Sequence, residues 1–358
     1  MPANTQNMDT ASSAASLMDN AAEVIAQHIV VHAPCRVDLA GGTMDIWPLY
    51  LFHPGAVTVN FAVSVLTRCR IRRLPGKQIK MVSLDTGRRE EFAGLDQVYA
   101  SKKFKHPLAG YLTRFFAPEG GFELETNSES PAGAGISGSS ALMIATTAAL
   151  ARLTGRELGK EEIRVIAQNV EAQLIRVPTG CQDYYPALYG GVSAIHLRPD
   201  GIRHEAVAVD AEELDRRFVL AYTGAPRKSG INNWEVFKSH INGDRKIFSN
   251  FERIGEIARA MHAAVAAADW TAVARLLREE WKLRKTNSPR ITTPLIEKLI
   301  QAATKQGALA AKVCGAGGGG CVVFLTEPGA KQRVADAIRQ QGGEVLPATV
   351  ARQGLTVD

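Results

Sequence analysis

A regular alternation of residue types over residues 57–72 constrains the fold of this chain more than any other feature. Every second residue from Val57 to Ile71 is apolar or small, and the residues between them become polar and then basic. A period of two places alternate side chains on opposite faces of a β-strand. The stretch therefore predicts a long strand with one buried face. Residues 29–39, interrupted at Pro34, and residues 121–128 predict partner strands.

Helical periodicity appears later in the chain. Residues 163–174 and 247–265 carry apolar side chains at steps of three and four residues, which is typical of amphipathic helices. Asp269 is placed to cap a further helix over residues 270–285. Residues 294–325 predict a helix, a glycine turn and a strand. Helices therefore dominate the second half of the chain.

The length of 358 residues exceeds the usual size of one hydrophobic core and predicts two domains. We expect a flexible leader over residues 1–28, an N-terminal domain over 29–208 and a C-terminal domain over 209–358, because the chain turns polar near residues 200–215. The leader contains no Lys or Arg and does not read as a signal peptide.

The composition narrows the range of partners. The net charge is +6, but the basic residues are scattered and form no run with interleaved aromatics, so we expect no nucleic-acid partner. No segment approaches the roughly 20 apolar residues needed to span a bilayer. The five cysteines have no metal-binding spacing and suggest reduced thiols in the cytoplasm. A modest positive charge suits anionic small molecules.

The stretch "PAGAGISGSS" over residues 131–140 directly precedes the helix-prone run "ALMIATTAALARL". A helix N-terminus carries unpaired N–H groups and partial positive charge, and flexible glycines let neighbouring N–H groups converge. The loop thus predicts a phosphate site, although a Ser-capped helix after a flexible loop stays an alternative. It is not the Walker pattern, because no Lys-Ser/Thr follows the last glycine. The candidate residues are Gly133, Ala134, Gly135, Ile136, Ser137, Gly138, Ser139 and Ser140.

Three further stretches carry chemistry. "HAPCRVDLAGGTMDIWPLY" (32–50) brings Arg36 on a strand into a Gly-Gly turn followed by Asp45. "VEAQLIRVPTGCQDYYPALYGG" (170–191) places Glu171 beside a helical apolar stripe and Asp183 in a loop beyond it. "KVCGAGGGG" (312–320) is a second glycine-rich turn.

Together with residues 131–140, these stretches resemble the motif set of the GHMP kinases, named for galactokinase, homoserine kinase, mevalonate kinase and phosphomevalonate kinase. The resemblance spans roughly residues 30–330. It implies a two-domain α+β fold, with an N-terminal domain like domain 2 of ribosomal protein S5 and a ferredoxin-like C-terminal domain. It also implies ATP and Mg²⁺ as cofactors and transfer of a phosphoryl group to a hydroxyl.

The resemblance assigns roles to individual residues. Asp183 matches the catalytic base, and Arg36 matches the arginine expected beside it. Glu171 matches the carboxylate that holds Mg²⁺ together with a loop serine, either Ser139 or Ser140. Alternatives are a turn-capping role for Asp183 and a solvent-exposed helix edge for Glu171.

The same resemblance places sugar contacts on both domains. Asp45 would bind sugar hydroxyls, with an Asx-turn role as the alternative. Gly317 would allow close backbone approach, or simply form a tight turn. Arg227, with Lys228, is a candidate for binding an anionic group on the sugar, with a merely solvated position in a polar loop as the alternative. The full set of expected sugar contacts is Gly42, Thr43, Asp45, Asp183, Gly317 and Arg227.

The stretches "LAGGTMDIWP", "LAYTGAPRKSG" and "LLREEWKLRK" resemble the heptose 7-phosphate kinases and the kinase part of L-fucokinases. This implies phosphorylation of D-glycero-D-manno-heptose 7-phosphate, at the anomeric hydroxyl. Thr43-Met44 departs from the Gly-Thr usual in that group, which keeps a free hexose such as L-fucose or galactose open as the substrate. A non-catalytic sugar sensor and an ATP-dependent decarboxylase of mevalonate diphosphate are alternatives from other classes. The sequence does not indicate the oligomeric state.

Overall fold

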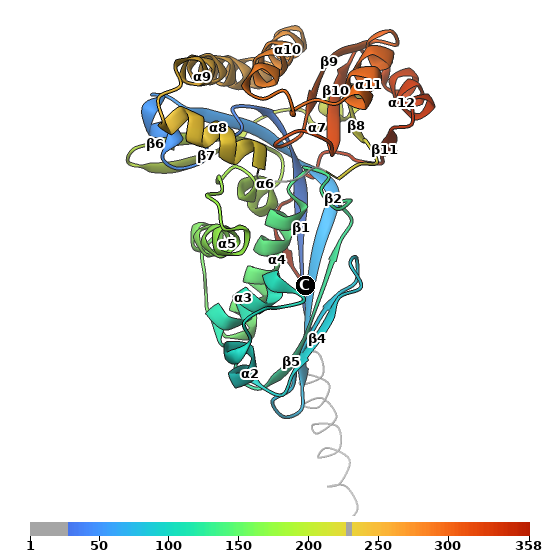
Figure 1. The fold of residues 1–358 in the computed structure, drawn as a ribbon. Helices are drawn as coiled ribbons and strands as arrows, with labels where there is room; N and C mark the ends of the chain where they lie inside the picture. The colour runs from blue at the N-terminus through green and yellow to red at the C-terminus, as the bar shows by residue number, and fades with distance from the viewer. Residues whose placement is uncertain (1–27, 227–230) are drawn as a thin grey trace, which may run out of the picture.

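The computed structural model describes residues 28–226 and 231–358, which form two sheets and the helices around them (Figure 1). The larger sheet has the order β12-β1-β2-β5-β3-β4, and the hairpin of β6 and β7 extends it from β2. Its strands are β1 (His28–Ala40), β2 (Val57–Leu74), β3 (Ile79–Ser83), β4 (Arg89–Phe92), β5 (Gly121–Ser128), β6 (Val192–Arg198), β7 (Gly201–Val207) and β12 (Thr356–Val357). The expected leader over residues 1–28 lies almost entirely outside the described residues.

The three strands expected from the sequence are confirmed. β1 and β2 pair antiparallel, with a register shift at Pro34/Cys35 where the proline interrupts the ladder. The prediction of one buried face holds only for the second half of β2, where Arg70 and Arg72 are exposed. In its first half both faces are buried, because α4 and α9 both pack against this strand.

The helices of the first half of the chain cover one face of the long strands (Figure 1). α4 lies centrally and contacts β1, β2 and α5. It begins at Gly138, whereas the helix-prone run begins only at residue 141, because Gly138 to Ser140 already adopt helical geometry. The helices of this half are α2 (Leu95–Ala100), α3 (Pro107–Phe116), α4 (Gly138–Leu153), α5 (Lys160–Ile175) and α6 (Tyr184–Tyr189), with a 3₁₀ turn η1 (Leu49–Phe52).

The smaller sheet has the order β11-β8-β10-β9 and is antiparallel throughout. Counted along the chain this order is 4-1-3-2, and helices follow the first and third strands, which is the ferredoxin-like arrangement. Its elements are β8 (Phe218–Tyr222), β9 (Ala308–Val313), β10 (Cys321–Thr326), β11 (Glu344–Leu346), α7 (Ala211–Arg217), α8 (Ile231–Ile241), α9 (Arg245–Ala266), α10 (Trp270–Asn287), α11 (Pro294–Thr304) and α12 (Lys331–Gln340).

α10 connects the two sheets, and α9 packs beside it on the larger one. α9 contacts β1 and β2, and α10 contacts both β1 and β9. The Asp269 side chain accepts a hydrogen bond from the backbone N–H of Ala272 and caps α10, as expected. The chain then returns to the larger sheet, where Val357 pairs with Val31. The domain boundary at residues 208/209 stays a prediction, and this return was not predicted from the sequence.

The structure differs from the expectation for residues 294–325, because a strand, β9, lies between the helix and the glycine turn. The helix ends at Thr304, Gly307 adopts a φ of +103°, and a strand rather than more helix leads into the glycine turn. The alanine-rich segment before that turn favours a helix by intrinsic propensity, but pairing with β10 overrides it. Across the described residues, no helix is both long enough and apolar enough to cross a membrane.

Candidate active site

A cavity of about 380 Å³ lies where the two sheets and α8 meet. Its walls come from β1 and the turn after it, from the start of α4, from the 175–183 segment, from α8 and from the glycine turn after β9. The lining includes Arg36, Thr43, Asp45, Ser137, Ser139, Ser140, Glu171, Gln182, Asp183, Asn233, Trp234, Arg284, Gly315 and Ala316. Residues from all four sequence motifs thus line one cavity.

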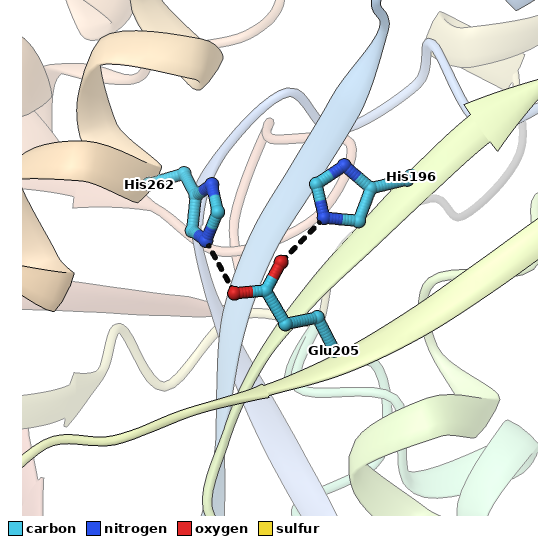
Figure 2. A group of neighbouring side chains, drawn as sticks. All are labelled: His196, Glu205 and His262. Carbon is cyan, nitrogen blue, oxygen red and sulfur yellow. Dashed lines mark hydrogen bonds and ion pairs between the residues drawn. The ribbon is translucent and has the colours of Figure 1, made fainter.

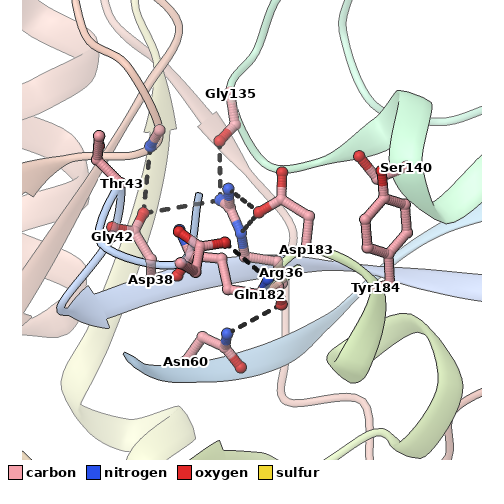
Figure 3. Close-up of polar contacts among 12 residues, drawn as sticks. Arg36, Asp38, Gly42, Thr43, Asn60, Gly135, Ser140, Gln182, Asp183 and Tyr184 are labelled. Carbon is pink, nitrogen blue, oxygen red and sulfur yellow. Dashed lines mark hydrogen bonds and ion pairs between the residues drawn. The ribbon is translucent and has the colours of Figure 1, made fainter. Parts of the chain in front are cut away.

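Arg36 and Asp183 form the best-defined pair in this cavity (Figure 3). The Arg36 Nε and Nη2 atoms donate to Asp183 Oδ1 at 2.8 and 2.5 Å. The guanidinium is 2 % exposed, whereas the Asp183 side chain is 24 % exposed and faces the cavity. Asp183 occupies the N-cap position of α6, but its side chain makes no capping hydrogen bond. The turn-capping alternative therefore has no support in the geometry.

Glu171 is buried below the start of α4. Its two carboxylate oxygens accept hydrogen bonds from Ser139 and Ser140, both at 2.9 Å, and from the Tyr184 hydroxyl at 2.6 Å. The alternative of a solvent-exposed helix edge is wrong, because Glu171 is only 6 % exposed. Burial raises the pKa of this carboxyl, and the three hydroxyl donors oppose that effect.

These oxygen atoms suit a hard divalent cation. Mg²⁺ binds through one or two carboxylates, hydroxyls, water and phosphate oxygens, and Ser139, Ser140 and Glu171 bring such donors to the cavity wall. The hydroxyl of Ser137 lines the same cavity and is buried without a hydrogen-bond partner among the described residues. The donor set therefore fits Mg²⁺ and a phosphate group, while either serine stays a candidate metal ligand.

The glycine-rich loop is fixed in place by its backbone. The Ile136 and Ala134 carbonyls accept from the N–H groups of Arg36 and Cys321 at 2.9 and 2.6 Å, and the Gly135 carbonyl accepts from Arg36 Nη1 at 2.9 Å. Gly135 and Ser137 have positive φ values of 79° and 65°. Of the eight candidate phosphate-binding residues, the cavity is lined by Ser137, Ser139 and Ser140. The preceding residues lie behind them and dock the loop onto β1 and β10.

The turn after β1 supplies the opposite wall. Asp45 is 3 % exposed and accepts a hydrogen bond from the Gln182 backbone N–H at 2.8 Å, so it ties this turn to the segment that carries Asp183. Burial raises the pKa of Asp45 to about 6. Its carboxylate packs so closely on Gly180 that any Cβ there would meet Asp45 Oδ2 at 1.9 Å.

Not every expected sugar contact reaches the cavity. Thr43 and Asp45 line it, but Gly42 lies behind them, where its carbonyl accepts from Arg284 Nη1 at 3.1 Å. Gly317 packs against the Ile291 backbone, and its neighbours Gly315 and Ala316 line the cavity instead. Arg227 lies outside the described residues.

A buried charge network behind the cavity was not found from the sequence. Lys312 Nζ contacts Asp38 Oδ2 at 2.5 Å and Glu280 Oε1 at 3.2 Å, and Glu280 also pairs with Arg284 at 3.4 Å. Arg36 lies 3.7 Å from Asp38 and so connects this network to the Arg36–Asp183 pair. Burial raises the pKa of Asp38, but the neighbouring Lys312, Arg36 and Arg284 together hold it well below its usual range. Three cations and three carboxylates, including Asp183, thus balance one another.

The contribution of α8 to the cavity wall was also not predicted from the sequence. Asn233 and Trp234 line the cavity, and Asn233 Oδ1 accepts a hydrogen bond from the Thr43 hydroxyl at 3.2 Å. This helix has no motif that distinguishes its polar face from an ordinary surface. Arg284 lies within the stretch "LLREEWKLRK", but nothing in that stretch predicted that it points toward the turn at Gly42.

Comparisons with known proteins agree with this arrangement. Residues 100–191 match the family model of the GHMP kinases N terminal domain, and residues 249–344 match that of the GHMP kinases C terminal domain. The chain is 28 % identical over 338 residues to D-glycero-alpha-D-manno-heptose 7-phosphate kinase of Campylobacter jejuni, with 91 % of this chain and 98 % of that protein covered.

A plant relative and a solved structure extend the comparison. The bifunctional fucokinase/GDP-fucose pyrophosphorylase of Arabidopsis thaliana is 24 % identical over 321 residues, covering 85 % of this chain and 30 % of that protein. A D-glycero-D-manno-heptose 1-phosphate kinase from Bacteroides thetaiotaomicron has the same fold, with a TM-score of 0.74, 23 % identity, and coverage of 92 % of this chain and 98 % of that one.

The ferredoxin-like domain, the glycine loop on α4 and the carboxylates across the cavity define a two-domain α+β phosphotransferase fold. The two family models together cover more than half of the chain, and the chain belongs to the GHMP kinase family. It is an ATP-dependent phosphotransferase with an alcohol group as acceptor.

Proposed function

We propose that the protein is a sugar kinase that transfers the γ-phosphoryl group of ATP to the anomeric hydroxyl of D-glycero-D-manno-heptose 7-phosphate. The observation that carries the proposal is the placement of Asp183, anchored by buried Arg36, in the same cavity as the Ser140–Glu171 cluster. The likeness to the Campylobacter heptose kinase over most of both chains supports the choice of substrate.

The chain's own residues account for each requirement of phosphoryl transfer. The start of α4 lines the cavity through Ser139 and Ser140, and the unpaired N–H groups and dipole of a helix N-terminus favour phosphate oxygens there. Asp183 takes the proton of the acceptor hydroxyl. The oxygen of that hydroxyl bonds to the γ-phosphorus, while the bond between the γ-phosphorus and the bridging oxygen of the β-phosphate breaks and ADP leaves. Arg36 fixes the Asp183 carboxylate and compensates its charge. Glu171, with Ser139 or Ser140, would hold Mg²⁺, which would neutralise charge on the phosphates.

Two groups of the enzyme orient the sugar in this proposal. Asp45 and Thr43 face the cavity from the first domain, and Asn233 and Trp234 face it from α8. A carboxylate can accept hydrogen bonds from two neighbouring hydroxyls. Arg227 stays the proposed contact for an anionic group on the sugar.

A panel of acceptors tests the substrate. ADP release is measured with MgATP and each of several sugars, namely the heptose 7-phosphate, other sugar phosphates, L-fucose and galactose. The proposal predicts the highest kcat/KM with the heptose 7-phosphate. A preference for L-fucose or galactose selects the free-hexose alternative, and saturable binding of ATP and sugar without ADP release selects the sensor.

Removing the charge of Glu171 is expected to weaken metal use. We expect Glu171→Gln to raise the Mg²⁺ concentration for half-maximal activity by at least about tenfold, because loss of even an outer-shell partner of a metal ligand costs about 10- to 100-fold in metal affinity. Activity is titrated with Mg²⁺ at fixed ATP, and Glu161→Gln, on the exposed side of the same helix, is the control. Comparing Ser139→Ala with Ser140→Ala decides which hydroxyl contributes. An unchanged titration in Glu171→Gln contradicts the assignment.

The pKa of Asp45 predicts a pH dependence. Because burial raises this pKa to about 6, the ionised form that accepts hydroxyl hydrogen bonds is lost as the pH falls below that value. We expect kcat/KM for the sugar to fall by about tenfold per pH unit below pH 6, as for one essential group in the free enzyme. The profile is measured between pH 5 and 8, and Asp45→Asn should remove this limb. A limb that persists in Asp45→Asn assigns it to another group.

A further inference from the structure

Three side chains outside the active site, from β6, β7 and α9, point toward one another (Figure 2). Glu205 Oε2 lies 2.7 Å from His196 Nε2, and Glu205 Oε1 lies 3.1 Å from His262 Nε2. Among the described residues, this is the one group of three His, Cys, Asp or Glu side chains whose donor atoms all lie within 4.8 Å of one another. None of the three lines the active-site cavity.

The fold brings these residues together from three elements. His196 on β6 pairs with Arg203 on β7, so Glu205 lies two residues further along β7 on the same face, in the diagonal position. His262 comes from α9, which packs against the neighbouring strand β2. Both imidazole rings direct Nε2 toward the carboxylate (Figure 2). The cluster therefore connects the β6–β7 hairpin of the larger sheet to a helix of the second half.

The donor set has the composition of a zinc site. Two imidazole nitrogens and one carboxylate are a recurring three-ligand set for Zn²⁺. Ligand atoms bound to one tetrahedral ion at about 2.0–2.2 Å lie roughly 3.3–3.5 Å apart, so the atoms of this cluster reach that spacing with small side-chain rotations. Imidazole also favours zinc, copper, nickel and cobalt over magnesium, which prefers oxygen ligands.

Partial exposure leaves room for further ligands. The side chains of His196, Glu205 and His262 are 35 %, 47 % and 24 % exposed, so water can complete the coordination of an ion. The rings of His196 and His262 already pack edge to face, with centroids 5.4 Å apart. The ligands are therefore largely positioned before an ion binds, which lowers the entropic cost of binding.

We propose that His196, Glu205 and His262 bind one zinc-type divalent ion, which clamps α9 to the β6–β7 hairpin. This site is independent of the Mg²⁺ that serves phosphoryl transfer, since it shares no residue with Ser139, Ser140 or Glu171. In the absence of the ion, the same residues form a hydrogen-bonded triad with Glu205 as the acceptor.

Zinc titration of the chelator-stripped full-length protein tests the proposal, with excess Mg²⁺ present throughout. We expect one equivalent of Zn²⁺ to bind the wild type by calorimetry. His196→Gln, Glu205→Gln and His262→Gln should each bind at least about tenfold more weakly, because loss of even a supporting partner costs about 10- to 100-fold in metal affinity. The control is His32→Gln, since His32 also faces a carboxylate, that of Asp358 at 3.8 Å, without a third donor.

Two further readouts separate metal binding from folding. Co²⁺ in place of Zn²⁺ should give visible d–d absorption in the wild type and in His32→Gln, and should lose it in the three cluster variants. Zn²⁺ should raise the melting temperature of the wild type and of His32→Gln but not of the three cluster variants. Without metal, all of these proteins should melt at the same temperature. Absence of saturable Zn²⁺ binding, or equal binding by wild type and Glu205→Gln, overturns the proposal.

Discussion

Replacing Asp183 with Asn is expected to lower kcat by about 10²- to 10⁴-fold, the usual contribution of a positioned general base. The amide keeps the size of the side chain and can still accept from Arg36, so the fold and the ATP site should persist. It cannot take up the proton of the acceptor hydroxyl. The measurement is the steady-state rate of ADP release with saturating MgATP and sugar, together with the dissociation constant of a nucleotide analogue.

The nucleotide affinity distinguishes this prediction from general damage. We expect it to change by no more than a few-fold in Asp183→Asn, because the phosphates are held at the start of α4. Asp200→Asn is the matched control, since Asp200 is an exposed carboxylate that also pairs with arginines, at the turn of the β6–β7 hairpin. A kcat for Asp183→Asn within tenfold of the wild type would remove Asp183 from the role of base.

The second large effect is expected from Lys312→Met. Lys312 is fully buried and pairs with both Asp38 and Glu280, so its loss leaves an excess of negative charge in the interior. Breaking a buried ion pair by removing one partner costs about 3–5 kcal/mol. We expect a decrease of that size in the free energy of unfolding, measured by urea denaturation.

A double-mutant cycle tests the origin of that loss. Removing the partner charge as well, in Asp38→Asn/Lys312→Met, should recover part of the stability, because the two effects are coupled through direct contact. Lys305→Met, at an exposed position just before the same strand, should stay within about 0.5 kcal/mol of the wild type. A loss below 1 kcal/mol for Lys312→Met, or strictly additive effects with Asp38→Asn, would contradict the network described for this site.

The local part of the fold could be predicted from the sequence because its signals are local. The alternation in β2, the apolar steps in α5 and α9, and the Asp269 cap each depend on residues within a few positions of one another. Strand β9 was not predicted because its own local signal points to a different structure. Its alanine-rich sequence favours a helix, and only pairing with β10 makes it a strand.

The candidate site also has a part that could be predicted from the sequence and a part that could not. Arg36, Glu171 and Asp183 could be named because each lies in a recognisable motif, and the structure brings all three to one cavity. The Lys312–Glu280–Arg284 network could not be named, since its partners in the first domain are more than 200 residues away. A lysine within an alanine-rich run carries no local sign that it will be buried. The recruitment of Asn233 and Trp234 likewise depends on the docking of α8.

The most direct test of the account is a crystal structure with Mg²⁺, a non-hydrolysable ATP analogue and the heptose 7-phosphate. The account predicts the polyphosphate at the N–H groups of Ser137 to Ser140, the metal at Glu171, and an acceptor oxygen within about 3 Å of the Asp183 carboxylate. A polyphosphate bound away from the start of α4, or an acceptor hydroxyl that Asp183 does not contact, would contradict it.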